Sequence, residues 1–301
     1  MGLTTSNMSL AMPAMDMVVP TVPTVPLLQL QFDEVDIDRY NMQRYSRHQA
    51  VPAIRQYLDS NANLSIEQAS GVLYDMMPDT GPGLDFINYD MSLLFIQTAQ
   101  QIPYSHPSQD KFVDLLASLA RTDRFNKPLI PSSPRDHRFF GAHGPFAIAL
   151  NQGSPLYPRR YTNNDEMVNL GAFVARLVRA KVLPRASYNT PASVLREALE
   201  YECHDPNCPI DASTWVAWCA VWILGAGREL YERVVLHPDL NQKYYLAGEL
   251  YRGAPFGIER WKFWQDRLAE IAGEPEVADD VRQLGLKAAD YMGALARGIF
   301  W

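Results

Sequence analysis

Three side chains in this sequence are candidates for proton transfer or charge stabilisation: Arg176, His137 and Tyr245. Arg176 lies at the edge of an apolar helical face, where its guanidinium can pair with a nearby carboxylate or reach into a pocket and polarise a carbonyl or enolate. The His137 imidazole titrates near neutrality and can move a proton, although surface hydrogen bonding is the alternative. A tyrosine hydroxyl can stabilise charge that develops on a carbonyl oxygen. We predict these three as catalytic residues.

Bulky aromatic side chains concentrate in the last third of the chain. A pocket for a flat apolar ligand uses such a lining, whereas the alternative is that the rings only fill the core. The two alternatives differ in whether the tryptophans face a cavity or pack solidly against one another. The predicted substrate-binding residues are Phe173, Trp215, Trp218, Trp222, Tyr231, Trp261 and Trp264.

The usual cofactor motifs do not occur in the sequence. We find no phosphate loop, no dinucleotide glycine fingerprint, no HExxH and no GxSxG. Cys203, His204 and Cys208 lie close together, but structural zinc takes four ligands, typically from two separated pairs, and a second pair is missing. We therefore expect no cofactor and no metal, and we predict a solvent-facing loop at these residues.

Composition narrows the class of partner. The net charge is −7 and the basic residues do not cluster, which argues against nucleic acid. Three cysteines are too few for a disulfide scaffold, so we expect a reducing, cytoplasmic setting. No Lys or Arg precedes Arg39, which excludes the usual secretory signal. The expected partner is a hydrophobic small-molecule substrate.

An uncharged run of 16 residues, 212–227, organises the rest of the chain. At 100° per residue its residues are apolar on every face, which is typical of a helix in the middle of a protein. The run is shorter than the ~20 residues that a bilayer span needs, so we predict no membrane span. We expect this tryptophan-rich helix to bend at Gly225–Gly227 and to continue toward Leu236.

The rest of the pattern predicts an all-α fold: a single large helical domain of about ten helices over residues 31–301, behind a flexible Met/Pro-rich leader at 1–30. Residues 122–163 are rich in proline and aromatic residues, and we predict an ordered coil insertion there that serves as a lid or pocket wall. The other expected helices lie at 35–60 (interrupted near Pro52), 65–77, 85–102, a helix capped by Ser108, 164–182, 190–201, 242–252, 258–271 and from 275 toward 301.

Four runs in order resemble a fungal family of unknown function, family 3632. They are QDKFVDLL (109–116), VNLGAFVARL (168–177), WILGAG (222–227) with Leu230-Tyr231, and ERWKFW (259–264). The resemblance covers residues 64–297 and implies a fungal, intracellular, mostly helical protein. The family carries no assigned activity, so it implies no catalytic residue.

Two functions are left open. The first is a cofactor-independent enzyme of fungal natural-product biosynthesis, a hetero-Diels–Alder cyclase (pericyclase) or a lyase, which holds a hydrophobic intermediate in an aromatic pocket and lowers the barrier by positioning. The alternative is a non-catalytic helical protein that binds a partner or a ligand. The fungal natural-product setting is suggested by the resemblance, and the aromatic cluster, with a coil long enough to cover it and no cofactor motif, suits such an enzyme. The second follows from the Met/Pro leader and the apolar terminus Ile299-Phe300-Trp301.

Overall fold

The computed structural model describes residues 28–32, 45–59, 64–77, 84–152, 164–184, 189–202, 210–238 and 246–298. Across these ranges the chain forms eleven α-helices and one π-helical segment, and it contains no β-strand. The predicted all-α fold with a single helical domain is therefore confirmed. Within the same ranges no helix combines the length and the apolar character that crossing a membrane requires.

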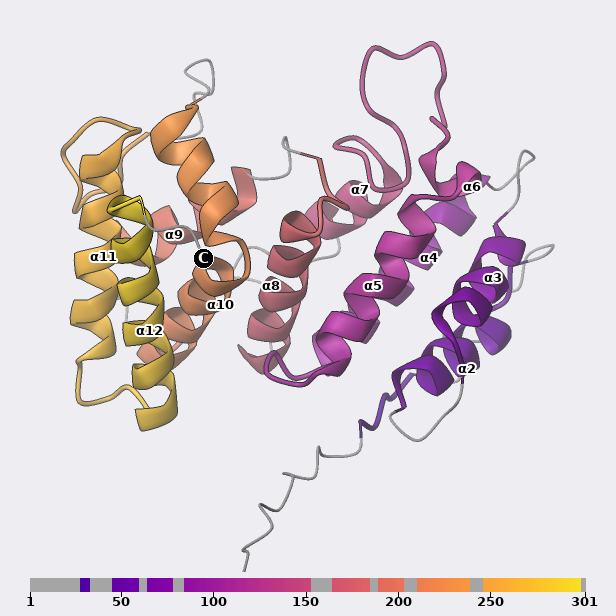
Figure 1. Ribbon diagram of the computed structural model, residues 1–301, viewed down its shortest axis with the longest axis horizontal. Coiled ribbons are helices and arrows are strands. Elements are labelled where there is room, and N and C mark those ends of the chain that lie inside the picture. Colours follow the sequence, from indigo (N-terminus) through magenta and orange to yellow (C-terminus); the bar gives the residue numbers. More distant parts are fainter. Residues whose placement is uncertain are drawn as a thin grey trace, which may run out of the picture.

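The middle of the molecule is α8 (Asn164–Arg179), which joins two groups of helices (Figure 1). On one side α8 contacts α4 (Leu84–Gln101) and α5 (Ser108–Ala120), which pack with α2 (Arg47–Leu58), α3 (Ile66–Met76) and α7 (Pro145–Gln152). On the other side α8 contacts α10 (Ala212–Tyr231), which packs against α9 (Asn189–Leu199), α11 (Ile258–Ala272) and α12 (Asp279–Ala296).

The tryptophan-rich helix is α10, and it is buried as predicted. Asp211 caps its first turn by accepting a hydrogen bond from the Thr214 amide at 2.7 Å. The predicted bend is also confirmed, because Ala226 leaves helical geometry at φ −143° and ψ 23° before the chain continues as the π segment η3 (Glu232–Leu236). Gly225 allows close helix packing, since a Cβ there would lie 2.7 Å from the Ala175 Cβ of α8.

Of three local predictions in the first half of the chain, one is confirmed and two are wrong. Ser65 and Gln68 form the expected capping box of α3. Pro52 does not interrupt α2 but lies inside it. Ser108 does not cap α5: it is the first helical residue, and its hydroxyl donates to the Leu58 carbonyl at 3.1 Å, which ties α5 to the end of α2.

Helix boundaries near the end of the chain differ from the prediction in two places. Residues 246–252 are not helical: the Gly248 amide donates to the buried Glu200 carboxylate and the Leu250 amide donates to the Glu200 backbone carbonyl, which holds this stretch as coil. The last helix begins at Asp279 rather than near Pro275. Of the predicted leader, only 28–30 falls within the described residues; there Leu30 is buried, and its carbonyl accepts a hydrogen bond from Arg55 Nη2 at 2.6 Å.

The described part of the predicted coil, residues 122–152, is ordered and packed on the body. It holds two short helices, α6 (Asp123–Asn126) and α7. Four buried phenylalanines form its core, and the ring of Phe139 lies edge-on to Phe95 of α4, with centroids 6.1 Å apart. The phenylalanines are Phe125, Phe139, Phe140 and Phe146. Aromatic packing, rather than regular backbone pairing, holds this segment in place.

Candidate functional site

The seven predicted substrate-binding aromatics are all buried, and they fall into two groups. Trp215, Trp218 and Trp222 lie on α10, where Trp218 and Trp222 pack against Gly171 of α8. Phe173 on α8 stacks on Phe112 of α5 with ring centroids 5.0 Å apart. The second group is Tyr231, Trp261 and Trp264, in which Tyr231 lies edge-on to Trp261 at 5.1 Å. None of the seven lines either of the two cavities described below.

The indole N–H groups of the two sets differ. Trp261 Nε1 donates to the Met292 carbonyl at 3.0 Å, and Trp264 Nε1 donates to Glu200 Oε1 at 2.6 Å. On α10, by contrast, the Nε1 atoms of Trp215, Trp218 and Trp222 are buried without a hydrogen-bond partner in the described structure. A buried donor without an acceptor costs about 1–3 kcal/mol. These three donors are therefore a feature that packing alone does not explain.

Gly171 of α8 lies where two of these indoles meet. A Cβ at Gly171 would come within 2.8 Å of Trp218 Nε1 and 3.1 Å of Trp222 Nε1. The rings thus press directly on the backbone of α8, and at this position they pack solidly. That is the arrangement expected from the core-filling alternative.

Two of the predicted catalytic residues, Arg176 and His137, lie within the described structure, and each makes its own set of contacts. Arg176 has a Nε–Asp110 Oδ1 contact of 3.1 Å and donates from Nη2 to the Tyr104 carbonyl at 2.9 Å, so it links α8 to α5 and the preceding turn. Burial lowers the pKa of its guanidinium, partly opposed by Asp110. Arg176 lines neither cavity, and catalysis by this residue stays a prediction.

His137 lies on the coil with both ring nitrogens engaged. Nδ1 contacts the His143 carbonyl at 3.1 Å, and Nε2 contacts the Ser133 hydroxyl at 3.0 Å. Since the carbonyl can only accept, Nδ1 donates, and a neutral ring then accepts at Nε2 from the hydroxyl. Tyr245 lies outside the described residues, as do Cys203, His204 and Cys208.

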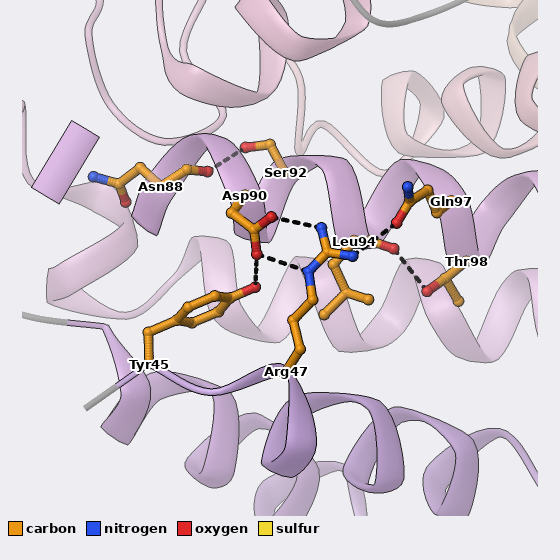
Figure 2. Close-up of polar contacts among 8 residues, drawn as sticks. All are labelled: Tyr45, Arg47, Asn88, Asp90, Ser92, Leu94, Gln97 and Thr98. Carbon is orange, nitrogen blue, oxygen red and sulfur yellow. Dashed lines mark hydrogen bonds and ion pairs between the residues drawn. The ribbon is translucent and has the colours of Figure 1, made fainter. Parts of the chain in front are cut away.

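A buried charge cluster joins the start of α2, and Tyr45 just before it, to α4 (Figure 2). Arg47 donates from Nε and Nη2 to the two oxygens of Asp90, at 2.8 and 2.6 Å, and Tyr45 donates its hydroxyl to the same carboxylate. Burial, together with the negative charge of Asp90, raises the pKa of Tyr45 well above its ordinary value of 10.0. The Tyr45 phenol therefore stays protonated and acts as a donor.

The Arg47 guanidinium also reaches the wall of a small polar cavity. Its Nη1 donates to Gln97 Oε1 at 3.1 Å on the side of the guanidinium away from Tyr45 (Figure 2). The cavity has a volume of about 220 Å³ and lies beside residues 28–32. Its remaining walls are Gln31, Phe32, Gln100, Gln101 and Glu166. Asp90 already neutralises Arg47, so a ligand in this cavity would meet mainly the side-chain amides of the glutamines rather than an unpaired positive charge.

A second buried charge cluster fastens the coil before α11. Glu200 accepts from Arg260 Nε at 2.6 Å and Nη2 at 2.9 Å, and its Oε2 accepts from the Gly248 amide at 2.6 Å. Gly248 is required there because a Cβ would lie 2.5 Å from that of Glu200. Neither charged side chain reaches solvent, so this cluster serves to join α9, α11 and the coil.

A larger cavity, of about 320 Å³, lies between the end of α5, the coil and the end of α8. We call it the coil cavity. Its charged lining residues are Arg121, Arg138 and Lys181, and none of the described lining residues is acidic. The described part of the coil therefore forms one wall of a cavity. None of the predicted substrate-binding residues lines this cavity, and neither does Arg176 or His137.

Apolar side chains from all three segments complete the coil cavity. They are Ala117, Ala120, Phe125, Phe140, Ala180, Val182 and Pro184. Sequence reasoning missed the three cations because each follows a helix or a turn with no motif around it. The one available signal was that Arg121 lies just before the coil predicted at 122–163 and that Lys181 lies in the last turn of the helix predicted at 164–182.

Arg138 is held by its neighbours in the coil. Its Nε and Nη2 donate to the two oxygens of Asp136, each at 2.8 Å, and its Nη1 donates to Asn126 Oδ1 at 3.0 Å. The Arg138 guanidinium lowers the pKa of Asp136 below its ordinary value of 3.8. The bound carboxylate neutralises Arg138, whereas no ion pair or side-chain hydrogen bond within the described structure engages Arg121 or Lys181.

Within the described residues, no group of three or more His, Cys, Asp or Glu side chains has the arrangement of a metal site. Comparison with curated proteins and with solved structures gives no match. A family model described as a protein of unknown function, DUF3632, matches residues 93–268, which is more than half of the chain. The match spans α5, α8, α10 and the first part of α11, to residue 268, and so includes the elements that build most of the coil cavity. The chain therefore belongs to the DUF3632 family.

Proposed function

We propose that this protein binds a small organic molecule in the coil cavity. The observation that carries the proposal is the cavity itself, about 320 Å³ in volume, with apolar walls and two cations that no described side chain neutralises. Ligand pockets typically begin near 300 Å³ and combine apolar walls with a few polar groups. This is the ligand-binding alternative of the two functions predicted above, in the expected cytoplasmic setting.

A fragment screen read out by backbone amide NMR tests the proposal. We expect shifts at Gly141 and Ala180 on the cavity wall, with ligands held in the millimolar range or tighter. Ala117 is half-buried in the wall, so Ala117→Trp fills the space and should abolish these shifts. Leu286→Trp, at an exposed position on α12 far from the lining of the coil cavity, is the control variant and should leave these shifts unchanged. Shifts that map elsewhere, or that survive Ala117→Trp, would refute the proposal.

A second candidate is the cofactor-independent cyclase or lyase acting on a hydrophobic natural-product intermediate. One observation favours it, namely the three buried indole donors of α10 that lack an acceptor. Such donors stabilise a developing oxyanion if a substrate carbonyl reaches them. The solid packing of Trp218 and Trp222 on Gly171 leaves no room for a substrate carbonyl at that point, which argues against this candidate. Mass spectrometry of metabolite extracts before and after incubation with the protein tests this candidate; conversion that Trp218→Phe leaves unchanged would count against a role for these donors.

A further inference from the structure

We propose that the ligand of the coil cavity is a monoanion, a carboxylate on a compact apolar body, and that Lys181 is its principal charged contact. This inference rests on the proposed function above and adds the chemical class of the ligand. It draws on three observations: the charge around the cavity, the backbone conformation of Lys181, and the size and character of the walls.

The charge balance of the cavity favours an anion with a single charge. Arg138 is neutralised by Asp136, which leaves the positive charges of Arg121 and Lys181. Arg121 follows α5 as its C-cap, and Lys181 lies just past the end of α8. A helix C-terminus carries about −0.5 of an elementary charge, so the two helix ends together offset about one of these two cations. A net charge of about +1 is left for a ligand.

Lys181 adopts a backbone conformation that lysine disfavours. Its φ is +58°, and it is the one non-glycine residue in the described structure with a positive φ. It occupies the left-handed position of a Schellman motif, in which the Val182 amide donates to the Leu177 carbonyl and the Lys181 amide donates to the Val178 carbonyl, both at 3.0 Å. Glycine is the usual residue there because a side chain strains the left-handed backbone.

The lysine at this position therefore weakens the fold locally while adding a cation to the wall of the cavity. A helix-ending motif needs only the backbone, and glycine would build it with less strain. Backbone strain of this kind, held by the surrounding structure, tends to occur at ligand contacts. At Lys181 the strain coincides with a position on the wall of a cavity that has no acidic residue in its described lining.

The walls define the rest of the ligand. Phe125 and Phe140 are buried and present ring surface, and alanines 117 and 120 leave room above α5. A volume of about 320 Å³ accommodates about ten waters at the roughly 30 Å³ that each occupies in the liquid. An organic ligand of about ten non-hydrogen atoms matches this size, which is that of a phenyl ring with a short acid chain.

Calorimetric titration with a matched pair of probes tests the class of ligand. 3-Phenylpropanoate and 3-phenylpropanamide have nearly the same shape, and only the first is charged. We expect the carboxylate to bind the wild-type protein at least tenfold more tightly than the amide. Lys181→Gln should remove this preference without weakening the amide, whereas Lys287→Gln, an exposed lysine on α12, should leave it unchanged.

The outcomes separate this inference from the proposed function. If the amide shifts the NMR signals of Gly141 and Ala180 as strongly as the carboxylate does, the coil cavity binds ligands but the monoanion inference is wrong. If neither probe moves these signals while neutral fragments do, the inference is wrong and the proposed function stands. If no fragment moves them, both are wrong. Inorganic phosphate that competes better than the carboxylate would overturn the assignment to a monoanion.

The strain in the Lys181 backbone can be tested without a ligand, by comparing the stability of two Lys181 variants. Lys181→Gly and Lys181→Gln both remove the charge, but only glycine relieves the left-handed conformation. We expect Lys181→Gly to raise the denaturation midpoint and to lose the carboxylate preference, whereas Lys181→Gln loses the preference with no gain in stability. A Lys181→Gly protein that is no more stable than the wild type would show that Lys181 is not strained, and would remove that support.

Discussion

Glu200 and Arg260 lie sixty residues apart in the sequence and form a bidentate ion pair that is fully shielded from solvent. The Glu200 carboxylate also accepts from Trp264 Nε1 and from the Gly248 amide. Four donors around one buried carboxylate satisfy its lone pairs, which is the condition under which a buried charge is tolerated. The pair therefore fixes how the coil before α11 sits on α9.

Neutralising Glu200 should destabilise the protein strongly. Glu200→Gln leaves the Arg260 guanidinium buried without its counter-charge, and breaking a buried pair in this way costs about 3–5 kcal/mol. Urea denaturation should show this loss, whereas Glu202→Gln at a neighbouring exposed position should stay within about 0.5 kcal/mol of the wild type. Equal midpoints for the two variants would show that the pair does not contribute as inferred.

Two buried tryptophans should respond differently to the same substitution. Trp222 and Trp264 are both 0% exposed, but Trp264 Nε1 donates to Glu200 whereas Trp222 Nε1 has no partner in the described structure. Trp264→Phe removes a hydrogen bond to a charged group, worth about 1.5–3 kcal/mol, in addition to the lost ring volume. Trp222→Phe removes volume and a donor that was already unsatisfied. Chemical denaturation should therefore show the larger loss for Trp264→Phe, and the reverse order would contradict this account of the indoles.

The Arg47–Asp90 pair should show strong coupling in a double-mutant cycle. Arg47→Met or Asp90→Leu alone leaves one buried charge and should cost about 3–5 kcal/mol. The double variant Arg47→Met/Asp90→Leu leaves no charge and should be more stable than either single variant. The free energies of unfolding of the four proteins give the coupling; simple additivity would mean that the two side chains do not act as a pair.

Two helical glycines should respond in opposite directions to alanine. A Cβ at Gly171 would press on the Trp218 ring at 2.8 Å, so Gly171→Ala overfills the α8–α10 contact and should cost about 1–3 kcal/mol. Gly71 lies inside α3 with nothing within 4 Å of its Cβ position, and Gly71→Ala should stabilise by roughly 0.5–1 kcal/mol through helix propensity alone. Thermal unfolding of both variants checks the prediction, which fails if Gly171→Ala is neutral.

The coil should weaken in acid because of Asp136. Hydrogen bonds from Arg138, with the nearby His143, lower the folded pKa of Asp136 below 3.8, so the folded state favours the deprotonated carboxylate. Its contribution to the free energy of unfolding is therefore complete above pH 3.8 and is lost as the pH falls through the lowered pKa. Asp136→Asn removes this contribution, so the stability difference from the wild type should shrink in acid. A difference that is the same at neutral and at acid pH would contradict this assignment.

Much of the helical architecture follows from the sequence, because the period of apolar residues indicates most of the long helices and their buried faces. The all-apolar run of α10 and the glycines at its bend predicted both its burial and its kink. Pro52 and Ser108 were misjudged because their roles depend on neighbours: proline is accommodated within α2, and the Ser108 hydroxyl bonds to α2 instead of capping its own helix.

Only the tertiary structure decided what lies next to what. Periodicity shows that α10 is buried, but not that its Trp218 and Trp222 indoles press on Gly171 of α8. Lys181, Arg121 and Arg138 come from three separate segments, and no local pattern encodes their meeting. The sequence itself determined most of the helices, because helical hydrogen bonding and the side-chain period act over about four residues. The coil cavity depends on long-range packing, which joins residues that are far apart in the chain.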